Sequence, residues 1–577
     1  MPQEQPPNSW THELGHQLAE ETPENELLSL HELLSAHAET TQLLLESPYC
    51  FPLYLSIART YQTLGYPDLA AGAAYKALLL SDAIRDDSDE YHEQATEAFE
   101  VVLENSSFPD TARVPSAQEK DECNQTVTIL ESFYLPLTYN ALAGNLLRCG
   151  CLRSAYSYSK QAAKLYPHDS RFNKIMSDAR QKVPQASPDS CELDNPLTWP
   201  DQGYVRREQY PWNTFEPDRF SQLGQLNAMM SEVAPRLEVL AVDLPAVSIA
   251  ATAFSKVETV KQLGIFAKED IKPGETVLVE TSLLAANNKL QDALCDACSA
   301  DLPGIGTPEF ENTVPCDECE VVFCSQECCE RAADSYHPAL CGMDVETIAK
   351  DVPPTEAANS LYSLLLLRAL AMAETRQCHP LSLDEVKYIW AEFHNLSLEE
   401  AWSKDVESPF RGLPQMLPFS FEYNIRLPFH MLEKMDIDIF RNPQYDVWVF
   451  NSLYAKFRGT ASARLSGLGG RAIRGPEVSA VHPMWCMANH SCDPNVSWEW
   501  GGSIRFWARE ERVDWQRDEE VTRRSEAGIR KGDELLNHYC DIELGVKDRR
   551  EWANGSLGGD CRCARCLWEA REMENGH

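Results

Sequence analysis

The chain has 577 residues, of which 43% are hydrophobic, and its formal net charge is −38. This length predicts about two to four domains. A surface this acidic repels phosphate groups, which argues against direct nucleic-acid binding and against docking on anionic membranes, and it favours basic partners.

We expect neither a membrane span nor a secretory signal in this sequence. The most apolar stretch, LYSLLLLRALAMA (361–373), is too short to cross a bilayer and contains Arg368, so we expect a buried helix there. The N-terminus lacks the basic start and apolar run of a secretory signal. We therefore expect an intracellular protein of the nucleus or the cytoplasm, where disulfides are rare and twenty cysteines favour metal ligation.

Residues 1–182 are predicted to be helical, and they contain two similar windows, Tyr54–Leu80 and Tyr139–Pro167. When Gly65 is aligned with Gly150, alanines coincide on both sides, which lets two antiparallel helices approach closely with glycine at the turn. This pattern resembles the tetratricopeptide (TPR) repeat. Because only two clear copies are present, an ordinary bundle of helical hairpins is the alternative.

Residues 183–236 are rich in Pro, Asp and Trp, and we interpret them as a linker followed by a connecting helix from Phe220 to about Leu240. From Leu237 onward the sequence has short β-rich runs. They are joined by turn residues such as KPGE (Lys272–Glu275), where Pro and Gly occupy the centre of a turn. A β-containing domain therefore begins near Leu237.

A cluster of seven cysteines and one histidine follows. Its four ligand pairs supply the eight ligands that two tetrahedral ions need. Alternating pairs are expected to share an ion, which gives one site of Cys295, Cys298, Cys324 and Cys328 and another of Cys316, Cys319, His337 and Cys341. Cys329 is a spare that could shift a ligand by one position. Such a short segment has little core of its own, so metal binding supplies much of its folding energy.

The C-terminal stretch GDCRCARC (559–566) offers three thiolates, from Cys561, Cys563 and Cys566. A closed structural zinc site needs four ligands. We predict that Cys492 supplies the fourth and thereby clips the end of the chain over its own loop. Three unliganded surface cysteines are the alternative.

Four motifs, in this order, resemble the signatures of the SET domain: GIFAKEDIKPGE (264–275), NHSCDPN (489–495), KGDELLNHYCD (531–541) and CxCxxC (561–566). The cluster at 295–341 resembles the MYND zinc finger, whose role is protein contact or structural support. A MYND finger after the first SET motif is typical of the SET-and-MYND protein-lysine methyltransferases. The helical repeats ahead of it resemble the arrangement of fungal proteins of this type.

The resemblance implies an α+β chain in which the SET domain is a set of short twisted sheets. The segment carrying Asn-His-Ser is expected to thread beneath the loop that carries the tyrosine motif. The predicted parts are a TPR-like helical region (1–182), a linker and connecting helix (183–236), the N-terminal part of SET (237–294), the MYND finger (295–341), a helical insert (342–480), the C-terminal part of SET (481–545) and a zinc-binding post-SET tail (546–577).

The resemblance also implies the cofactors, S-adenosylmethionine (AdoMet) and three zinc ions, and a methyl-transfer site. Tyr539 is the catalytic candidate, and Asn489 and His490 are expected to bind AdoMet partly through backbone atoms. The complete set of expected cofactor-binding residues is Lys261, Gly264, Asn451, Asn489, His490 and Tyr539.

Three features depart from the family pattern. The early segment reads KQLG (Lys261–Gly264) where relatives often have Lys-Gly-Arg-Gly, and Gly559 stands where relatives often have an aromatic residue near the adenine. Residues 511–528 form a charged insertion that we expect to be a solvated helix or loop, with a gene-model error as the alternative.

The sequence therefore predicts an AdoMet-dependent protein-lysine methyltransferase that acts on a basic protein or peptide, such as a histone tail. Further protein partners are expected on the TPR-like region and the MYND finger. The alternative is a catalytically weak scaffold or transcriptional regulator, which the departures in the cofactor segment favour.

Overall fold

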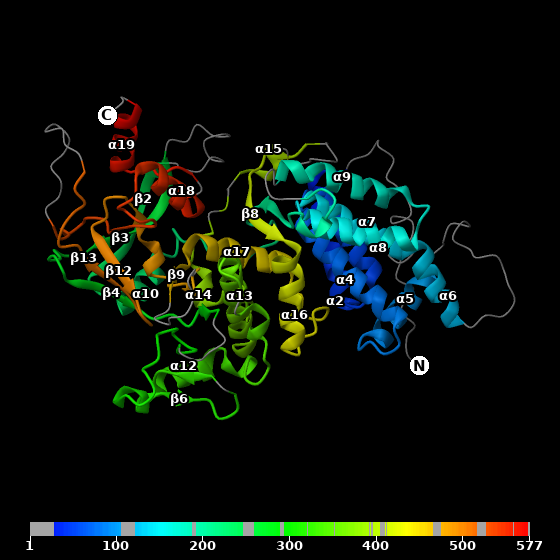
Figure 1. Cartoon of the computed structure of the whole chain (residues 1–577), viewed down its shortest axis with the longest axis horizontal. Coiled ribbons are helices and arrows are strands. Elements are labelled where there is room, and N and C mark those ends of the chain that lie inside the picture. Colours follow the sequence, from blue (N-terminus) through cyan, green and yellow to red (C-terminus); the bar gives the residue numbers. More distant parts are fainter. Residues whose placement is uncertain are drawn as a thin grey trace. The chain divides into compact units, whose positions relative to one another are not determined.

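The computed structural model describes residues 28–105, 122–186, 192–245, 259–288, 294–319, 321–350, 352–391, 393, 396–403, 410, 412–465, 475–515, 527–557 and 559–574. Most of the charged insertion at 511–528 lies outside these ranges. The chain divides into two compact units (Figure 1). Unit 1 comprises Met1–Arg206, Leu396–Glu433 and Ile437–Trp448, and unit 2 comprises Arg207–Asn395, Lys434–Asp436 and Val449–His577.

Unit 1 is mainly helical. Its helices include α2 (Leu30–Glu46), α3 (Phe51–Thr63), α4 (Pro67–Arg85), α5 (His92–Asn105), α6 (Glu122–Ile129), α7 (Leu135–Arg148), α8 (Leu152–Leu165) and α9 (Ser170–Ala186). The turns between α3 and α4 and between α7 and α8 contain Gly65 and Gly150, whose φ angles of 72° and 82° suit glycine. The predicted helical region with glycine at two hairpin turns is therefore confirmed, whereas its assignment to the TPR repeat stays a prediction.

Small side chains allow these helices to pack closely. Ala70, Ala74 and Ala77 on α4 are fully buried, and α4 packs against both α3 and α7. Unit 1 also contains a two-stranded antiparallel sheet of β1 (Gln202–Arg206) and β8 (Gln415–Ser420). Strand β8 comes from a later part of the chain, so this unit is not a continuous segment.

The described residues of unit 2 form five small sheets rather than one large sheet. The strands described are β2 (Leu237–Pro245) with β3 (Thr259–Ala267), β6 (Val314–Pro315) with β7 (Val322–Phe323), β11 (Asn489–His490) with β14 (Leu536–Asn537), the order β12 (Val496–Trp500), β13 (Ile504–Ala508), β4 (Thr276–Glu280), and the order β5 (Ala285–Asn287), β10 (Val478–Ala480), β9 (Ser462–Arg464). The predicted α+β fold class is confirmed: a helical N-terminal region precedes a domain of small sheets that carries several cysteine clusters.

One core joins the small sheets of unit 2. Val239, Ile265, Ile504, Phe506 and Leu535 are fully buried members of this core and come from segments far apart in the sequence. The predicted KPGE turn is present, because the N–H of Glu275 donates to Lys272 O at 3.2 Å and Gly274 has a φ angle of 79°.

The connecting helix is shorter than predicted. Helix α10 spans Leu223–Val233, and strand β2 begins at Leu237, so the expected continuation to about Leu240 is wrong. Pro235 explains the early end, because a proline disfavours the helical conformation in the preceding residue. Ala234 accordingly has a φ angle of −152°.

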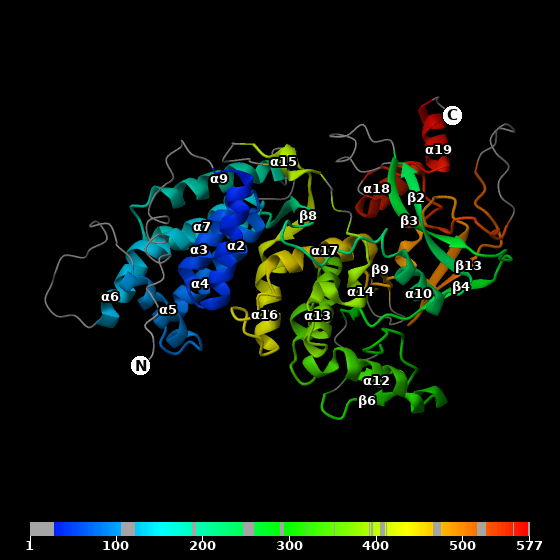
Figure 2. The ribbon, with the colours of Figure 1, turned by 180° about the vertical axis from the view of Figure 1, so that it is seen from behind.

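The apolar stretch that contains Arg368 forms helix α13 (Ala357–Thr375), which is largely buried as predicted. The Arg368 guanidinium donates to Asp296 O at 3.0 and 3.1 Å and lies 3.6 Å from the centre of the Tyr336 ring. Figures 1 and 2 show the cysteine-rich finger, marked by β6 and α12 (Gln326–Ser335), beside α13. A buried cation therefore joins the finger to helix α13 within unit 2.

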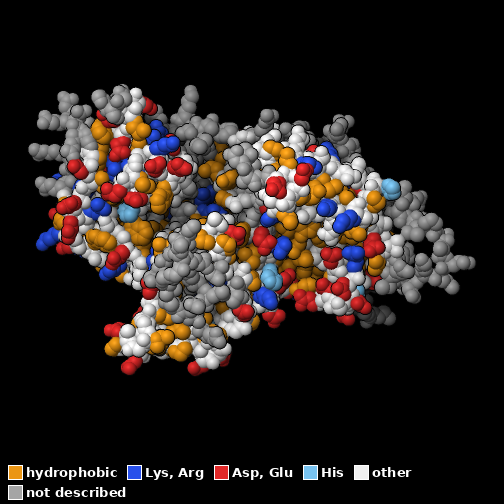
Figure 3. Space-filling view, in the orientation of Figure 1, with side chains coloured by type: hydrophobic (Ala, Val, Ile, Leu, Met, Phe, Trp, Pro, Cys, Tyr) orange, Lys and Arg blue, Asp and Glu red, His pale blue; other side chains and the backbone are white. Residues whose placement is uncertain are grey.

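The surface carries charges of both signs. In Figure 3, Asp and Glu side chains are scattered over the visible face and interspersed with Lys and Arg. Among the helices in the described ranges, none combines the length and hydrophobicity that crossing a bilayer requires.

Candidate active site and metal centres

The candidate site is built where β11 pairs with β14 in parallel. Asn489 lies opposite Leu536 and His490 opposite Asn537, so two motifs that are distant in sequence become neighbours. The N–H of Ser491 continues the pairing by donating to Asn537 O at 2.8 Å. This pairing places the NHSCDPN segment directly against the segment that leads to Tyr539.

Asn495 fastens the far end of the same loop. Its Nδ2 donates to Glu534 O at 2.7 Å, and its Oδ1 accepts the N–H of Leu536 at 2.8 Å. The buried Asn495 side chain thus replaces part of a strand partner. The sequence predicts only that Asn495, an amide side chain after a proline, helps to shape a turn, and its contacts with the Glu534 segment are not evident from it.

The side chain of Asn489 is fixed by two acceptors. Its Nδ2 donates to Leu263 O at 2.9 Å and to Glu534 Oε1 at 2.7 Å. Both partners are acceptors, which determines the orientation of the amide. Within the described part of the chain, Asn489 Oδ1 accepts no hydrogen bond and remains available as an acceptor.

Gly264 lies against this pair. A Cβ added to Gly264 would overlap Glu534 Oε1 and lie 3.0 Å from Asn489 Nδ2, so a larger residue fits only if the Glu534 carboxylate moves aside. Burial raises the pKa of the Glu534 carboxyl above its usual range. Glu534 lies within the motif KGDELLNHYCD, and the role of its side chain is not evident from the sequence.

Tyr539 is held at both its backbone and its hydroxyl. Its hydroxyl donates to Ala488 O at 2.8 Å, and its backbone N–H donates to His490 Nδ1 at 3.0 Å. The two rings lie with their centres 5.0 Å apart. Burial lowers the pKa of His490 to about 4, so the imidazole is neutral at physiological pH.

Aromatic side chains lie next to this region. The Trp498 ring stacks on His538 at 5.8 Å and contacts Trp485 at 5.3 Å between ring centres. Trp485 begins the short helical turn η9 (Trp485–Met487) that leads into Asn489. The surroundings of the segment before Asn489 are therefore largely apolar.

The other two predicted cofactor residues have contacts elsewhere. Lys261 is exposed on β3, with its Nζ 5.0 Å from the centre of the Phe220 ring. Asn451 is buried in helix α17 (Val447–Thr460), with Nδ2 3.5 Å from the Tyr210 hydroxyl. Hydrogen bonds and close approach bring together Gly264, Asn489, His490 and Tyr539, and the described contacts of Lys261 and Asn451 do not join that group.

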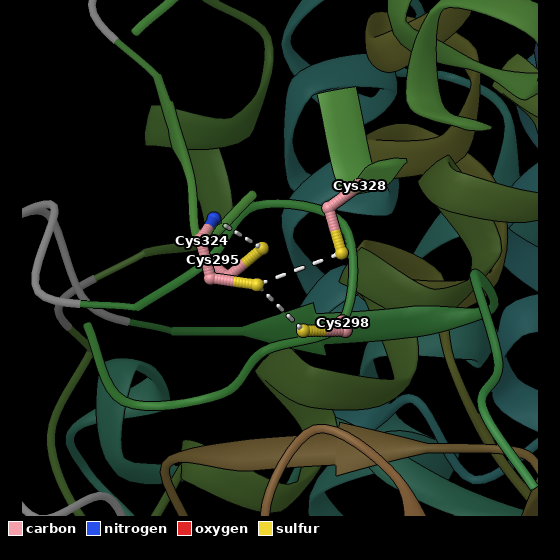
Figure 4. Close-up of side chains that lie close together, drawn as sticks. All are labelled: Cys295, Cys298, Cys324 and Cys328. Carbon is pink, nitrogen blue, oxygen red and sulfur yellow. Dashed lines mark hydrogen bonds between the residues drawn. The ribbon is translucent and has the colours of Figure 1, made fainter. Parts of the chain in front are cut away.

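One group in the finger brings four thiols together, those of Cys295, Cys298, Cys324 and Cys328, as Figure 4 shows. The Sγ of Cys324 lies 3.8 Å from that of Cys298 and 3.6 Å from that of Cys328, and the N–H of Cys324 donates to Cys295 Sγ at 3.2 Å. All four sulfur atoms lie within 4.8 Å of one another.

The other four candidate ligands of the finger form a separate group. His337 Nε2 lies 3.3 Å from Cys316 Sγ and 3.7 Å from Cys319 Sγ, and Cys341 Sγ is 3.7 Å from that of Cys316. The four residues are half-buried, whereas three of the four cysteines in the first group are fully buried. The alternating pairs that we expected to share an ion are the ones grouped here, and Cys329 belongs to neither group.

The tail cysteines meet Cys492. The Sγ of Cys492 lies 3.4 Å from that of Cys566 and 4.0 Å from that of Cys561, and Cys563 completes the group. We call Cys492, Cys561, Cys563 and Cys566 the tail cluster. Helices α18 (Val546–Leu557) and α19 (Ala564–Glu574) surround it.

Two arginines lie beside the tail cluster, and both also pair with Glu569. Four thiolates around a divalent cation have a net charge of −2, which is costly to bury without cations nearby. Arg549 is fully buried with Nη2 3.7 Å from Cys566 Sγ, and Arg565 Nη1 donates to Cys492 O at 2.9 Å. These arginines were not predicted, because no spacing rule links them to the cysteines.

The chemistry of these groups suits zinc. Three separate sets of four Cys or His ligands are close enough to hold an ion, and a further set of His490, Cys492 and Cys540 shares Cys492 with the tail cluster. The described cysteines are all free of disulfide bonds. Thiolate-rich groups of four are typical of structural zinc sites, which have no open coordination position.

Comparisons with known proteins agree with this geometry. Residues 262–540 match the family model of the SET domain. The protein-lysine N-trimethyltransferase SMYD5 of Danio rerio is 28% identical over 109 residues, that of Mus musculus 30% and that of Homo sapiens 32%, each match covering 15% of this chain. The matched stretch spans about a quarter of these curated relatives, 26% of their length. The chain is thus a SET domain protein that is distantly related to the SMYD5 lysine methyltransferases.

Proposed function

We propose that the protein is an AdoMet-dependent protein-lysine N-methyltransferase. The observation that carries this proposal is the parallel pairing of β11 with β14, which holds Asn489 and His490 against Tyr539 beside Gly264. The distant relatives are named protein-lysine N-trimethyltransferases, which supports the reaction class.

The residues around Asn489 fit the methyl donor. AdoMet would supply a methyl group on a sulfonium and carries an ammonium group, which is a hydrogen-bond donor. The Oδ1 of Asn489 is an acceptor because the Nδ2 is already engaged by Leu263 O and Glu534. The absence of a side chain at Gly264 leaves room for the Glu534 carboxylate that fixes this amide. Lys261 and Asn451 stay cofactor candidates by resemblance.

Tyr539 would orient the substrate amine. Attack on a methyl group requires a neutral lysine, and an apolar environment such as that near Trp485 and Trp498 lowers the pKa of an amine. Because the Tyr539 hydroxyl donates its hydrogen to Ala488 O, its oxygen presents lone pairs that can accept a hydrogen from the amine. Alignment of amine, methyl and sulfur then contributes several kcal/mol, as is usual for well-held reactants.

The zinc ions would be structural. The two finger groups and the tail cluster would each hold one ion, with the twelve ligands Cys295, Cys298, Cys316, Cys319, Cys324, Cys328, His337, Cys341, Cys492, Cys561, Cys563 and Cys566. We further propose that the MYND-type finger and the TPR-like helices contact protein partners, and that the substrate is a basic protein or peptide. The net charge of −38 supports a basic substrate.

Methyl transfer from labelled AdoMet to histones and to a cell lysate tests this function. We expect transfer by the wild type, and a fall in kcat of at least about tenfold in Tyr539→Phe with little change in the Kd for AdoMet, because the lost hydroxyl acts on the amine. Tyr204→Phe is the matched control, since Tyr204 is 58% exposed in unit 1. Equal transfer by Tyr539→Phe would contradict the proposed role of Tyr539.

Calorimetry with AdoMet separates the enzyme from the alternative scaffold. Micromolar binding favours the methyltransferase. Absence of binding by a folded, zinc-loaded protein would favour a scaffold that keeps the SET fold without its cofactor.

A further inference from the structure

The His490 ring lies between Tyr539 and the tail cluster. Its Nδ1 accepts the backbone N–H of Tyr539 at 3.0 Å, and its Nε2 lies 3.3 Å from Cys492 Sγ. One imidazole therefore contacts both the candidate catalytic residue and a candidate metal ligand.

The contact with Tyr539 fixes the tautomer of His490. A backbone N–H can only donate, so Nδ1 must carry a lone pair and the ring cannot be an imidazolium. The single ring proton is consequently on Nε2, which faces Cys492 Sγ. A protonated nitrogen has no lone pair for a metal ion, so His490 is not a ligand although it lies within ligand distance of Cys492 and Cys540.

We propose that His490 is a positioning residue that couples the zinc ion of the tail cluster to the backbone of Tyr539. Its Nε2–H donates to the Cys492 thiolate while its Nδ1 holds the Tyr539 N–H. This inference rests on the proposed function for its consequence in methyl transfer, but the coupling itself is a property of the fold.

The coupling has a direction that chemistry explains. A zinc-bound thiolate carries negative charge and is a strong acceptor, and hydrogen bonds from outer residues to metal ligands orient them. Without the ion, Cys492 is a neutral thiol and a weak acceptor. Its sulfur is then no longer linked, through a shared ion, to the sulfur atoms of Cys561, Cys563 and Cys566. The His490 ring then loses one of its two anchors, and the Tyr539 segment loosens.

Hydrogen–deuterium exchange at the Tyr539 amide tests the coupling. Cys561→Ser removes a ligand of the tail cluster, and we expect one zinc fewer and roughly three- to tenfold faster exchange at Tyr539, the range for one weakened hydrogen bond. Cys319→Ser is the matched control, because it removes a ligand of a finger group and should leave Tyr539 exchange unchanged. Unchanged exchange in Cys561→Ser with one zinc lost would overturn the proposal.

Two substitutions of His490 separate its two contacts. In His490→Gln the amide nitrogen can replace Nε2 as donor to Cys492, while the acceptor for Tyr539 is lost. In His490→Asn the amide oxygen can replace Nδ1 as acceptor, while the donor to Cys492 is lost. We expect faster Tyr539 exchange with unchanged zinc content in His490→Gln, a result that stays informative if Cys561→Ser fails to fold.

Cobalt substitution reports the sulfur side. In protein reconstituted with Co²⁺, the difference spectrum against Cys561→Ser isolates the tail cluster. We expect its thiolate-to-metal absorption to move to longer wavelength in His490→Asn and to stay in place in His490→Gln, because a lost N–H···S bond raises the electron density on sulfur. An unchanged band in His490→Asn would overturn donation to Cys492. Neither readout uses AdoMet or methyl transfer, so this proposal and the proposed function fail separately.

Discussion

At the scale of residues, the site depends on the close packing of Asn489, Glu534 and Gly264. The Glu534 carboxylate accepts a hydrogen bond from Asn489 Nδ2 at 2.7 Å. A methyl group added at Gly264 would collide with this carboxylate. Because the carboxylate is the flexible end of a side chain, it would move away from an added Cβ. The amide of Asn489 would then lose one of the two acceptors that set its orientation.

We therefore expect Gly264→Ala to weaken cofactor binding more than it weakens the fold. The Kd for AdoMet, measured by calorimetry, should rise by about tenfold, which corresponds to about 1.4 kcal/mol. Gly501→Ala is the control, because a Cβ at Gly501 meets nothing within 4 Å. Equal affinities in the two variants would show that Asn489 binds no cofactor through its side chain.

The sequence predicted part of this residue-level picture. Asn489, His490 and Tyr539 were identified because their motifs resemble those of a known family. Glu534 and Asn495 lie inside the same motifs, but their roles depend on hydrogen bonds across more than thirty residues, at separations of 45 and 39 positions. A linear pattern contains no information on such partners.

At the scale of elements, strand β4 is joined to the turn that precedes the site. Glu280, the last residue of β4, accepts the N–H groups of Met484 at 3.0 Å and of Trp485 at 2.8 Å, at the start of η9. Burial raises the pKa of Glu280 from 4.5 to about 7, and Cys486 lies near enough to interact with its charge. The carboxyl is therefore easier to keep protonated in the folded state than in the unfolded state.

This shift predicts a stability that falls with pH. The folded state binds the proton more tightly, so the contribution of Glu280 is greatest below pH 4.5 and is lost as pH rises to about 7. The difference in unfolding free energy between the wild type and Glu280→Gln should thus decrease between pH 5 and pH 8, by up to about 3 kcal/mol. Chemical denaturation followed by tryptophan fluorescence measures it. A difference that stays constant over this range would show that the folded-state pKa is not raised and that the buried carboxyl is ionised.

Elements were predicted well where local chemistry determines them. The turns at Gly65 and Gly150 and the KPGE turn follow from glycine and proline at positions that need them. The predicted connecting helix is too long because its apolar residues continue into β2. Its end is set by Pro235, which disfavours the helical conformation in the preceding residue. The pairing of β11 with β14 was expected only through resemblance, since each strand has two residues and no detectable periodicity.

At the scale of the whole molecule, the metal groups differ in their exposure. The Cys316 group is half-buried throughout, whereas the Cys295 group and the tail cluster each have three fully buried ligands. A chelator should therefore reach the Cys316 group first.

We expect three zinc ions per chain by mass spectrometry, one for each separate group of four ligands, and release in at least two phases on chelation. Cys319→Ser should abolish the fast phase, and Cys561→Ser should remove one ion from the slow phase. Release of all ions in one phase would indicate that metal loss unfolds the three groups together.

The division of the chain into two units could not be predicted from the sequence. Residues 396–433 and 437–448 belong to unit 1, although they lie inside the region that the sequence analysis assigned to the SET insert. Their hydrophobic residues mark them as buried but do not specify which core they join. The predicted domain boundaries therefore stay predictions.

The distance along the chain between Cys492 and its partners has a consequence for biosynthesis. Cys561 and Cys566 follow Cys492 by 69 and 74 residues, and unit 1 takes its last segment from residues that end at Trp448. For most of translation, the mainly helical unit 1 therefore lacks its last segments. The tail cluster can form only after Cys566 has emerged. The proposed support of the Tyr539 backbone through His490 is therefore complete only when zinc binds near the end of synthesis.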